Sequence, residues 1–166
     1  LYLRLVDQAV AELKGDEWHE EINPEINVTL SAYLPGEYIA DTDVRLNLYR
    51  RLSGLKEESD LEMMVEEMKD RFGALPAEAA NLIRVMSVRL LLKKKGVLRL
   101  DVIPDGLTLT FSTDTSVNPQ RLVRLVSSQP RRFQILSDRK VKVRTPGLSP
   151  LQGLMEVSRV LKDLGG

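Results

Sequence analysis

One segment of this sequence is apolar on almost every side of a helix, and it constrains the fold more than any other feature. Proline is favoured in the first turn of a helix and glycine at its left-handed end, so Pro76 and Gly96 mark the predicted limits. The run Lys93-Lys94-Lys95 suits the negative end of the helix dipole. The apolar residues are Leu82, Ile83, Val85, Met86, Val88, Leu90, Leu91 and Leu92. A helix without a polar face is usually buried on most sides. We therefore expect a central helix on which both halves of the chain pack.

The residues before this helix predict a mainly helical part with one or two short strands. Their spacing indicates an amphipathic helix at 1–13, an acidic loop at 14–24, a half-buried strand at 26–32, a helix at 41–52 and a further helix ending at 73. Ser59 and Glu62 have the spacing of a capping box, in which each side chain satisfies a free amide at the start of a helix. The inward face of that helix is expected to carry Leu61, Met64, Val65, Met68 and Phe72.

The residues after the central helix predict two ββα units. The expected strands are 97–103, 107–111, 133–136 and 140–143, and the two helices begin at Asn118-Pro119 and Ser149-Pro150. The predicted fold class is α+β: an N-terminal helical part around a long central helix, then a ββαββα four-stranded antiparallel sheet with helices on one face. We expect residues 1–96 and 97–166 to be the two halves of one compact domain.

Charge also divides the chain, between residues 75 and 76. Residues 1–75 contain 8 Lys and Arg against 17 Asp and Glu, whereas residues 76–166 contain 16 against 7. The formal net charge of the whole chain is +0, so the total conceals this difference. Such an asymmetry indicates binding, either between the two halves or with another molecule.

Composition excludes several kinds of protein. The sequence has no Cys, which excludes disulfides, a thiolate nucleophile and cysteine-based zinc sites and is typical of a reducing cytoplasm. No apolar run approaches the ~18 residues of a membrane helix. Because a helical pattern begins at Leu1, without an initiator Met, we expect a fragment cut from a longer protein.

No catalytic, cofactor or metal site is expected. A metal site needs at least three convergent ligands, and the single histidine, His19, lies beside Trp18 and two carboxylates in the acidic loop. The glycine-rich phosphate-binding patterns are absent. Paired acidic residues such as Glu57-Glu58 and Glu66-Glu67 are typical of a solvated face.

The basic half offers an alternative function, direct nucleic-acid contact. Its clustered cations are Arg121, Arg124, Arg131, Arg132, Arg139, Lys140, Lys142 and Arg144. Stacking chemistry is missing, because Phe111 and Phe133 occupy strand positions that should face the core. We therefore favour a solvated basic surface and keep a basic module that contacts DNA or RNA polymerase directly as the alternative.

A dense motif occupies residues 33–82. It reads Tyr33-Leu34-Pro35, Tyr38-Ile39, Asp41, Arg45-Leu46, Tyr49-Arg50-Arg51-Leu52, Glu66-Glu67-Met68-Lys69-Asp70-Arg71-Phe72-Gly73, Leu75-Pro76, Glu78 and Asn81-Leu82. In this order the motif resembles the C-terminal TRCF domain of the bacterial transcription-repair coupling factor, Mfd. Looser matches such as Val117-Asn118-Pro119 follow it.

The resemblance implies a non-catalytic protein-interaction domain of a larger bacterial, cytoplasmic protein. In that family the whole protein is an ATP-driven DNA translocase, which displaces stalled RNA polymerase and recruits excision repair. The C-terminal domain acts as an autoinhibitory clamp: it packs on a UvrB-like N-terminal module, masks the surface that UvrA binds and restrains the motor. The motor motifs themselves are absent from this chain.

The resemblance also implies which residues bind the partner module. By motif position these are Glu67 and Arg71, with Asp70 between them. Helical spacing places Met63, Glu67 and Asp70 away from the inward stripe and Arg71 at its edge. We therefore expect these four residues to bind the partner. The alternative is an exposed Glu67–Arg71 pair that only stabilises its own helix, by ~0.2–0.5 kcal/mol.

Overall fold

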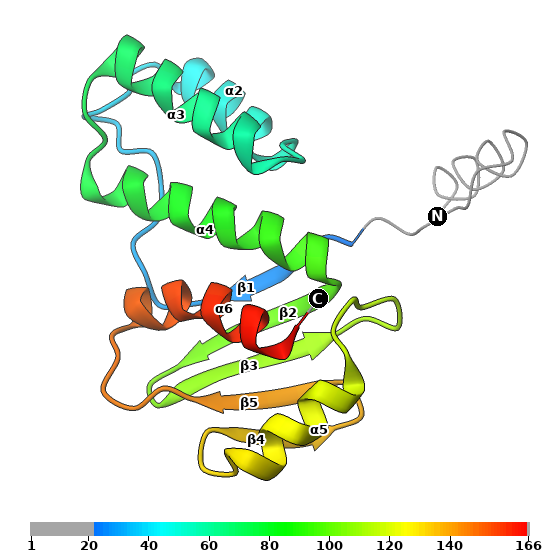
Figure 1. The fold of residues 1–166 in the computed structure, drawn as a ribbon. Helices are drawn as coiled ribbons and strands as arrows, with labels where there is room; N and C mark the ends of the chain where they lie inside the picture. Colours follow the sequence, from blue (N-terminus) through cyan, green and yellow to red (C-terminus); the bar gives the residue numbers. More distant parts are fainter. Residues whose placement is uncertain (1–21, 166) are drawn as a thin grey trace, which may run out of the picture.

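A computed structural model describes residues 22–165, in which five strands and five helices follow one another along the chain (Figure 1). In order they are β1 (Glu25–Asn27), α2 (Thr42–Ser53), α3 (Glu58–Phe72), α4 (Ala77–Lys95), β2 (Val97–Ile103), β3 (Gly106–Phe111), α5 (Pro119–Ser128), β4 (Phe133–Ser137), β5 (Lys140–Arg144) and α6 (Pro150–Leu164). The helix predicted at 1–13, with Trp18 and His19, lies outside the described residues.

The strands form one mixed sheet in the order β1-β2-β3-β5-β4 (Figure 1). β2, β3, β5 and β4 run antiparallel to one another, with Leu109 opposite both Leu100 and Val141. This confirms the α+β class and the four strands of the two ββα units. The sheet has a fifth strand, however, because β1 pairs parallel to β2, with Ile26 opposite Leu100. The predicted four-stranded antiparallel sheet was wrong at this edge, since local patterns do not record which distant strand a segment pairs with.

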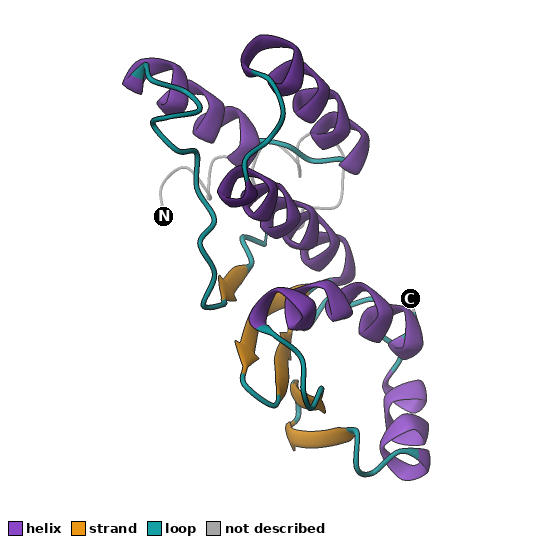
Figure 2. Cartoon of the chain, turned by 90° about the vertical axis from the view of Figure 1, so that its left-hand side faces the viewer, coloured by secondary structure: helices purple, strands orange, loops and turns teal. Residues whose placement is uncertain are grey.

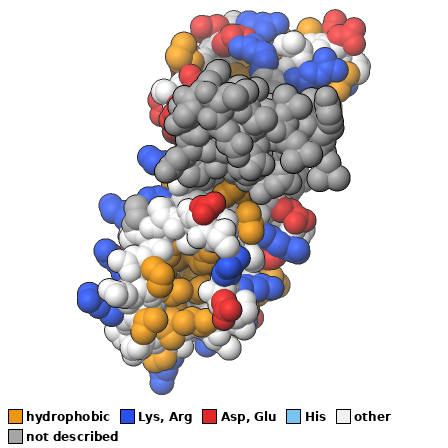
Figure 3. Space-filling view, turned by 90° about the vertical axis from the view of Figure 1, so that its right-hand side faces the viewer, with side chains coloured by type: hydrophobic (Ala, Val, Ile, Leu, Met, Phe, Trp, Pro, Cys, Tyr) orange, Lys and Arg blue, Asp and Glu red, His pale blue; other side chains and the backbone are white. Residues whose placement is uncertain are grey.

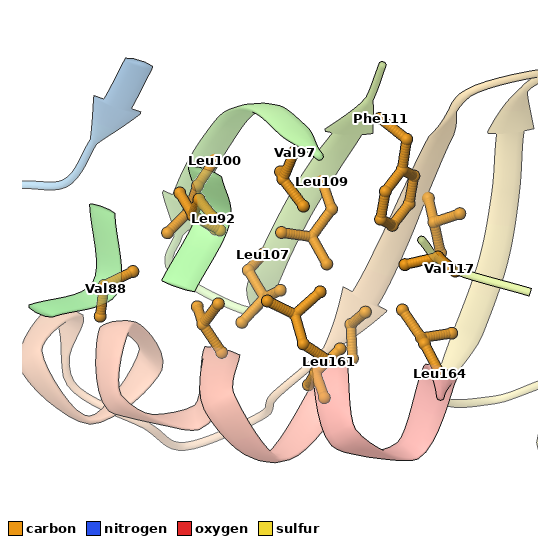
Figure 4. Close-up of a cluster of buried hydrophobic side chains, with 14 of the residues drawn as sticks. Val88, Leu92, Val97, Leu100, Leu107, Leu109, Phe111, Val117, Leu161 and Leu164 are labelled. Atoms are coloured by element: carbon orange, nitrogen blue, oxygen red, sulfur yellow. The ribbon is translucent and has the colours of Figure 1, made fainter. Parts of the chain in front are cut away.

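Helices α4, α5 and α6 lie on one face of the sheet and bury its apolar side chains (Figures 2 and 4). In this sheet cluster, Leu107 and Leu109 from β3 meet Leu92 from α4 and Leu161 from α6. In Figure 2 no helix covers the opposite face of the sheet within the described part of the chain. The helices are therefore on one face, as predicted.

A second apolar cluster forms among α2, α3 and α4. This helical cluster contains Leu48 from α2, Met68 from α3 and Leu82 from α4. Because α4 also contributes Val88 and Leu92 to the sheet cluster, it packs against both parts of the molecule. Its nearly all-round apolar surface predicted this central position.

The strand predicted at 26–32 is much shorter than its alternating pattern indicates. After Asn27 the chain leaves the sheet and crosses to the start of α4, where the Tyr33 amide donates to the Glu78 carbonyl at 3.2 Å. Along this path Leu30 packs against the sheet cluster and Ala32 against the helical cluster. The alternating apolar residues therefore pack against two different apolar clusters and do not continue the β1–β2 strand pairing.

Most helix limits match the capping chemistry in the sequence. The side chain of Asp41 caps α2 and that of Asn118 caps α5, and α4 ends at Gly96 in the left-handed conformation. The capping box predicted at Ser59 was wrong, because α3 begins at Glu58 and has no side-chain cap. The Glu57 carbonyl already accepts the amides of the first turn, so Ser59 lies inside the helix.

The surface of the sheet half carries some exposed apolar side chains. Val123 on α5 and Ile135 and Leu136 on β4 are exposed, and hydrophobic atoms gather in the lower half of the face drawn in Figure 3. Among the described helices, none is both long and apolar enough to span a membrane.

Candidate partner-binding site on helix α3

Helix α3 has one buried face and one exposed face. Leu61, Met64 and Met68 are buried in the helical cluster, as the predicted inward stripe requires. On the other side, 72% of Met63 is accessible to solvent, more than for any other large apolar side chain in the described range. Met63 therefore lies on the outer surface of α3.

The structure brings the four predicted contact residues together on that exposed face. One shallow hollow on this face is lined by all four of them, Met63, Glu67, Asp70 and Arg71. We call the surface of α3 around this hollow the α3 ridge. Ser59, Glu62 and Glu66 complete its rim. The surface is therefore mostly acidic, with one apolar and one basic side chain.

The charge of Glu67 is held by two arginines from different helices. Arg51 on α2 donates to both carboxylate oxygens of Glu67, at 2.5 and 2.7 Å, and Arg71 donates to one of them at 3.1 Å. A two-pronged arginine–carboxylate pair is the strongest and most directional of the ion pairs in proteins. Glu67 therefore connects α2 to the outer face of α3.

This arrangement changes the acidity of Glu67. The hydrogen bonds from Arg51, and then the one from Arg71, lower the pKa of Glu67 to about 2, although partial desolvation opposes them. The side chain of Glu67 is still 36% exposed, so water can replace either arginine. Glu67 is thus ionised at neutral pH and able to exchange partners.

Sequence reasoning did not identify Arg51 as part of this site. The residue stands inside the Tyr49–Leu52 motif, but it lies 16 positions before Glu67 and on another helix. No spacing rule connects the two positions, because their contact depends on how α2 packs against α3. The motif itself is the only signal in the sequence that includes Arg51.

A tyrosine fixes the end of α3 next to the ridge. The Tyr38 hydroxyl lies 2.8 Å from the Gly73 carbonyl and 3.3 Å from that of Met68, and the Tyr38 ring meets Phe72 edge-on at 5.8 Å. The guanidinium of Arg71 also lies over the Phe72 ring, 4.8 Å from its centre. Burial raises the pKa of Tyr38, which keeps its hydroxyl a donor.

The side chains of the α3 ridge are of the kinds found at protein–protein contacts. Within residues 22–165, no three acidic, histidine or cysteine side chains are grouped to bind a metal ion. The ridge combines an exposed apolar side chain, several carboxylates and a shared ion pair, which together suit a protein surface of opposite charge.

The fold and this surface define a small α+β domain whose most prominent exposed feature is a charged helix. The family model described as the TRCF domain matches residues 28–122. The chain therefore belongs to the TRCF domain family.

Proteins from several bacteria are similar in sequence to this chain. The chain is 32% identical to the transcription-repair-coupling factor of Haemophilus influenzae and 30% identical to that of Escherichia coli, in each case over 86% of this chain. It is 26% identical to the protein of the same name from Myxococcus xanthus over 99% of this chain. The chain spans 14% of the length of each of these relatives.

A solved structure shows the same fold. A crystal structure of the C-terminal domain of a transcription-repair coupling factor superposes with a TM-score of 0.71 at 23% identity. The match covers 88% of this chain and 96% of that one. The α+β architecture is therefore that of this family.

Proposed function

We propose that this chain is the regulatory C-terminal domain of a bacterial, cytoplasmic transcription-repair coupling factor. In the whole protein, the α3 ridge docks on a UvrB-like N-terminal module, masks the surface of that module that UvrA binds, and restrains the ATP-driven DNA translocase. Release of the ridge accompanies displacement of stalled RNA polymerase and recruitment of excision repair. Membership of the TRCF domain family supports this proposal. The proposal assigns no reaction to the domain itself.

One observation carries the proposal: Glu67 is ionised, reachable and shared between two arginines. Ion pairs at the rim of an interface add modest affinity, are weakened by salt and set which partner is accepted. A cation on the partner module can take the place of Arg51 or Arg71 without leaving a buried charge unpaired. The ridge can therefore bind and release.

The test is a double charge reversal, Glu67→Arg with Arg71→Glu, in the full-length protein. The reversal inverts the charges that α3 presents to the partner, so the clamp should open. It also replaces the ion pair between Arg51 and Glu67 by two neighbouring cations, so circular dichroism must show that the domain stays folded. We expect UvrA binding and basal ATPase activity both to increase by at least about threefold, which corresponds to at least ~0.7 kcal/mol. Pull-down measures the first and a coupled ATPase assay the second.

A matched control reverses a pair on another helix. Glu156 and Arg159 on α6 are paired at 3.5 Å and lie far from α3 in the sequence. Their reversal also leaves the net charge unchanged and should leave both activities at the wild-type level. The proposal is wrong if the folded Glu67/Arg71 variant behaves like this control.

A further inference from the structure

The outer face of the sheet, opposite α4, α5 and α6, carries a row of cations on β5. Val141 and Val143 are buried in the sheet cluster. Because successive residues of a strand point to opposite faces, Lys140, Lys142 and Arg144 lie on the outer face. No helix of the described chain covers that side of the sheet in Figure 2. The row is therefore open to a partner.

The charges in this row are not neutralised by the rest of the described chain. On β2, by contrast, Arg99 pairs with Asp101 at 3.0 Å. The side chains of Lys140, Lys142 and Arg144 form no ion pair or hydrogen bond with another residue in the range 22–165. An external anion can therefore bind them without breaking an internal pair.

Two more arginines extend the row at the ends of β4. Arg131 precedes β4 and Arg139 follows it, and both are exposed. Arg131 also lines a shallow hollow with Arg132, Arg144 and Pro146 at the end of β5. Guanidinium groups present several donors in one plane, a geometry that suits phosphate oxygens.

The remaining side chains of this face favour phosphates over an acidic protein. Thr110 on β3 stands opposite Lys140 and is partly exposed, so its hydroxyl lies beside that ammonium group, whereas Thr108, opposite Lys142, is buried. The outer positions of β3 and β5 hold no large apolar or aromatic side chain, and on β2 the same face exposes Ile103, opposite Gly106. Protein interfaces depend on such anchors and single strands on stacking aromatics, whereas a duplex backbone requires only charge and hydrogen-bond donors.

The dimensions of the row agree with a duplex. Alternate residues on a strand are ~6.7 Å apart, so the three cations of β5 extend over ~13 Å. Successive phosphates of one DNA strand advance by ~3.4 Å along the helix axis, so the row spans about four base pairs. The face can contact several phosphates at once.

We propose that the outer face of β3 and β5, with Arg131 and Arg139 at its margins, binds the phosphate backbone of duplex DNA without sequence preference. This activity uses a different surface from the α3 ridge and does not depend on the clamp. It gives the basic half of the chain a function that the clamp leaves unassigned.

Fluorescence anisotropy of a labelled random-sequence duplex of about 20 base pairs, titrated with the 166-residue chain, tests this proposal. At about 50 mM salt we expect saturable binding, and log K should fall by ~0.9 per unit log salt for each phosphate contacted. The variant Lys140→Gln/Lys142→Gln/Arg144→Gln should bind at least about 10-fold more weakly, with a salt slope smaller by about 2 to 3.

A second triple variant controls for net charge. Arg124, Arg159 and Lys162 are exposed on α5 and α6, which lie on the other face of the sheet. Their replacement by Gln removes the same charge and should leave affinity and salt slope within about twofold of the wild type. Circular dichroism confirms that both variants are folded, and the single variants at 140, 142 and 144 should each lower the slope by about 1.

Several results would overturn the proposal. They are an absence of binding at about 50 mM salt, an equal loss of affinity in both triple variants, and tighter binding to a single strand of the same length. Competition by polyglutamate as effective as by unlabelled duplex would assign the face to an acidic protein instead.

Discussion

At the scale of single residues, the most informative contact is the one between Arg51 and Glu67. Glu67 and Arg71 are an i,i+4 pair, so their proximity could be predicted from helical spacing alone. The stronger donor, Arg51, comes from α2 and was not predicted. The carboxylate of Glu67 therefore already accepts hydrogen bonds within the isolated domain, and a partner protein must compete with Arg51 for this carboxylate.

Acid titration should show this contact. The pKa of Glu67 is lowered to about 2, below its ordinary value of about 4.3, so the ionised carboxylate stabilises the fold above pH ~4.3 and this stability is lost as the pH falls toward 2. The wild-type free energy of unfolding should therefore decrease more than that of Glu67→Gln between these limits. Urea denaturation at a series of pH values measures both.

A substitution on the same helix gives the reference for this titration. Glu66 is exposed and lies 3.7 Å from Lys69, away from Arg51. The free energy of unfolding of Glu66→Gln should decrease as steeply as that of the wild type when the pH falls. Parallel curves for wild type and Glu67→Gln would show that the contact with Arg51 does not persist in solution. The effect is expected to be small, since solvent screens a side chain that is 36% exposed.

At the scale of elements, two serines with similar sequence contexts have different roles. Ser149 caps α6: its hydroxyl accepts from the Gln152 amide at 3.2 Å, and the Gln152 side chain accepts from the Ser149 amide at 2.9 Å. Ser59 has the same spacing to Glu62, yet α3 begins one residue before it and Ser59 makes no cap.

Alanine substitutions distinguish the two serines. Ser149→Ala should lower the free energy of unfolding by about 0.5–2 kcal/mol, because the Gln152 amide loses the hydroxyl that accepts its hydrogen bond. Ser59→Ala should change it by less than about 0.5 kcal/mol, as is usual for an exposed site without a special contact. Thermal or urea denaturation measures both, and equal losses would mean that Ser59 caps α3 after all.

At the scale of the whole molecule, α4 is the element on which stability depends. Leu82 near its start is buried in the helical cluster and Leu92 near its end in the sheet cluster. The α3 ridge and the cationic face of the sheet are therefore attached to the two sides of one helix. A division of the chain at Gly96 separates an acidic, mainly helical part from a basic part with four of the five described strands. The two apolar clusters nevertheless share α4.

A cavity in the helical cluster should test whether the two cores unfold together. Leu82→Ala should cost about 2–5 kcal/mol, the usual loss for a buried leucine. If α4 couples the clusters, hydrogen exchange should show the same loss of protection in β3 and β5 as in α2 and α3. Protection that falls only in α2 and α3 would show that the two halves unfold as separate units.

Local patterns were sufficient wherever the structure depends on neighbours in the sequence. They predicted α4 with its left-handed end at Gly96, the hairpin of β2 and β3, and the inward stripe of α3 through Leu61, Met64 and Met68. They were not sufficient for the alternating segment after Asn27, where apolar residues bridge two clusters. An alternating pattern with a period of two residues indicates which side chains are buried. It does not indicate which part of the molecule those side chains pack against.

Sequence alone therefore determined the fold class, the two differently charged parts and the exposed position of Met63, Glu67 and Asp70, because helix and strand periodicity and capping are local. Only the tertiary structure decided that β1 joins the sheet in parallel, that Arg51 holds Glu67, and that Lys140, Lys142 and Arg144 share an uncovered face. These features depend on the packing of segments far apart in the chain, and no spacing between residues encodes that packing.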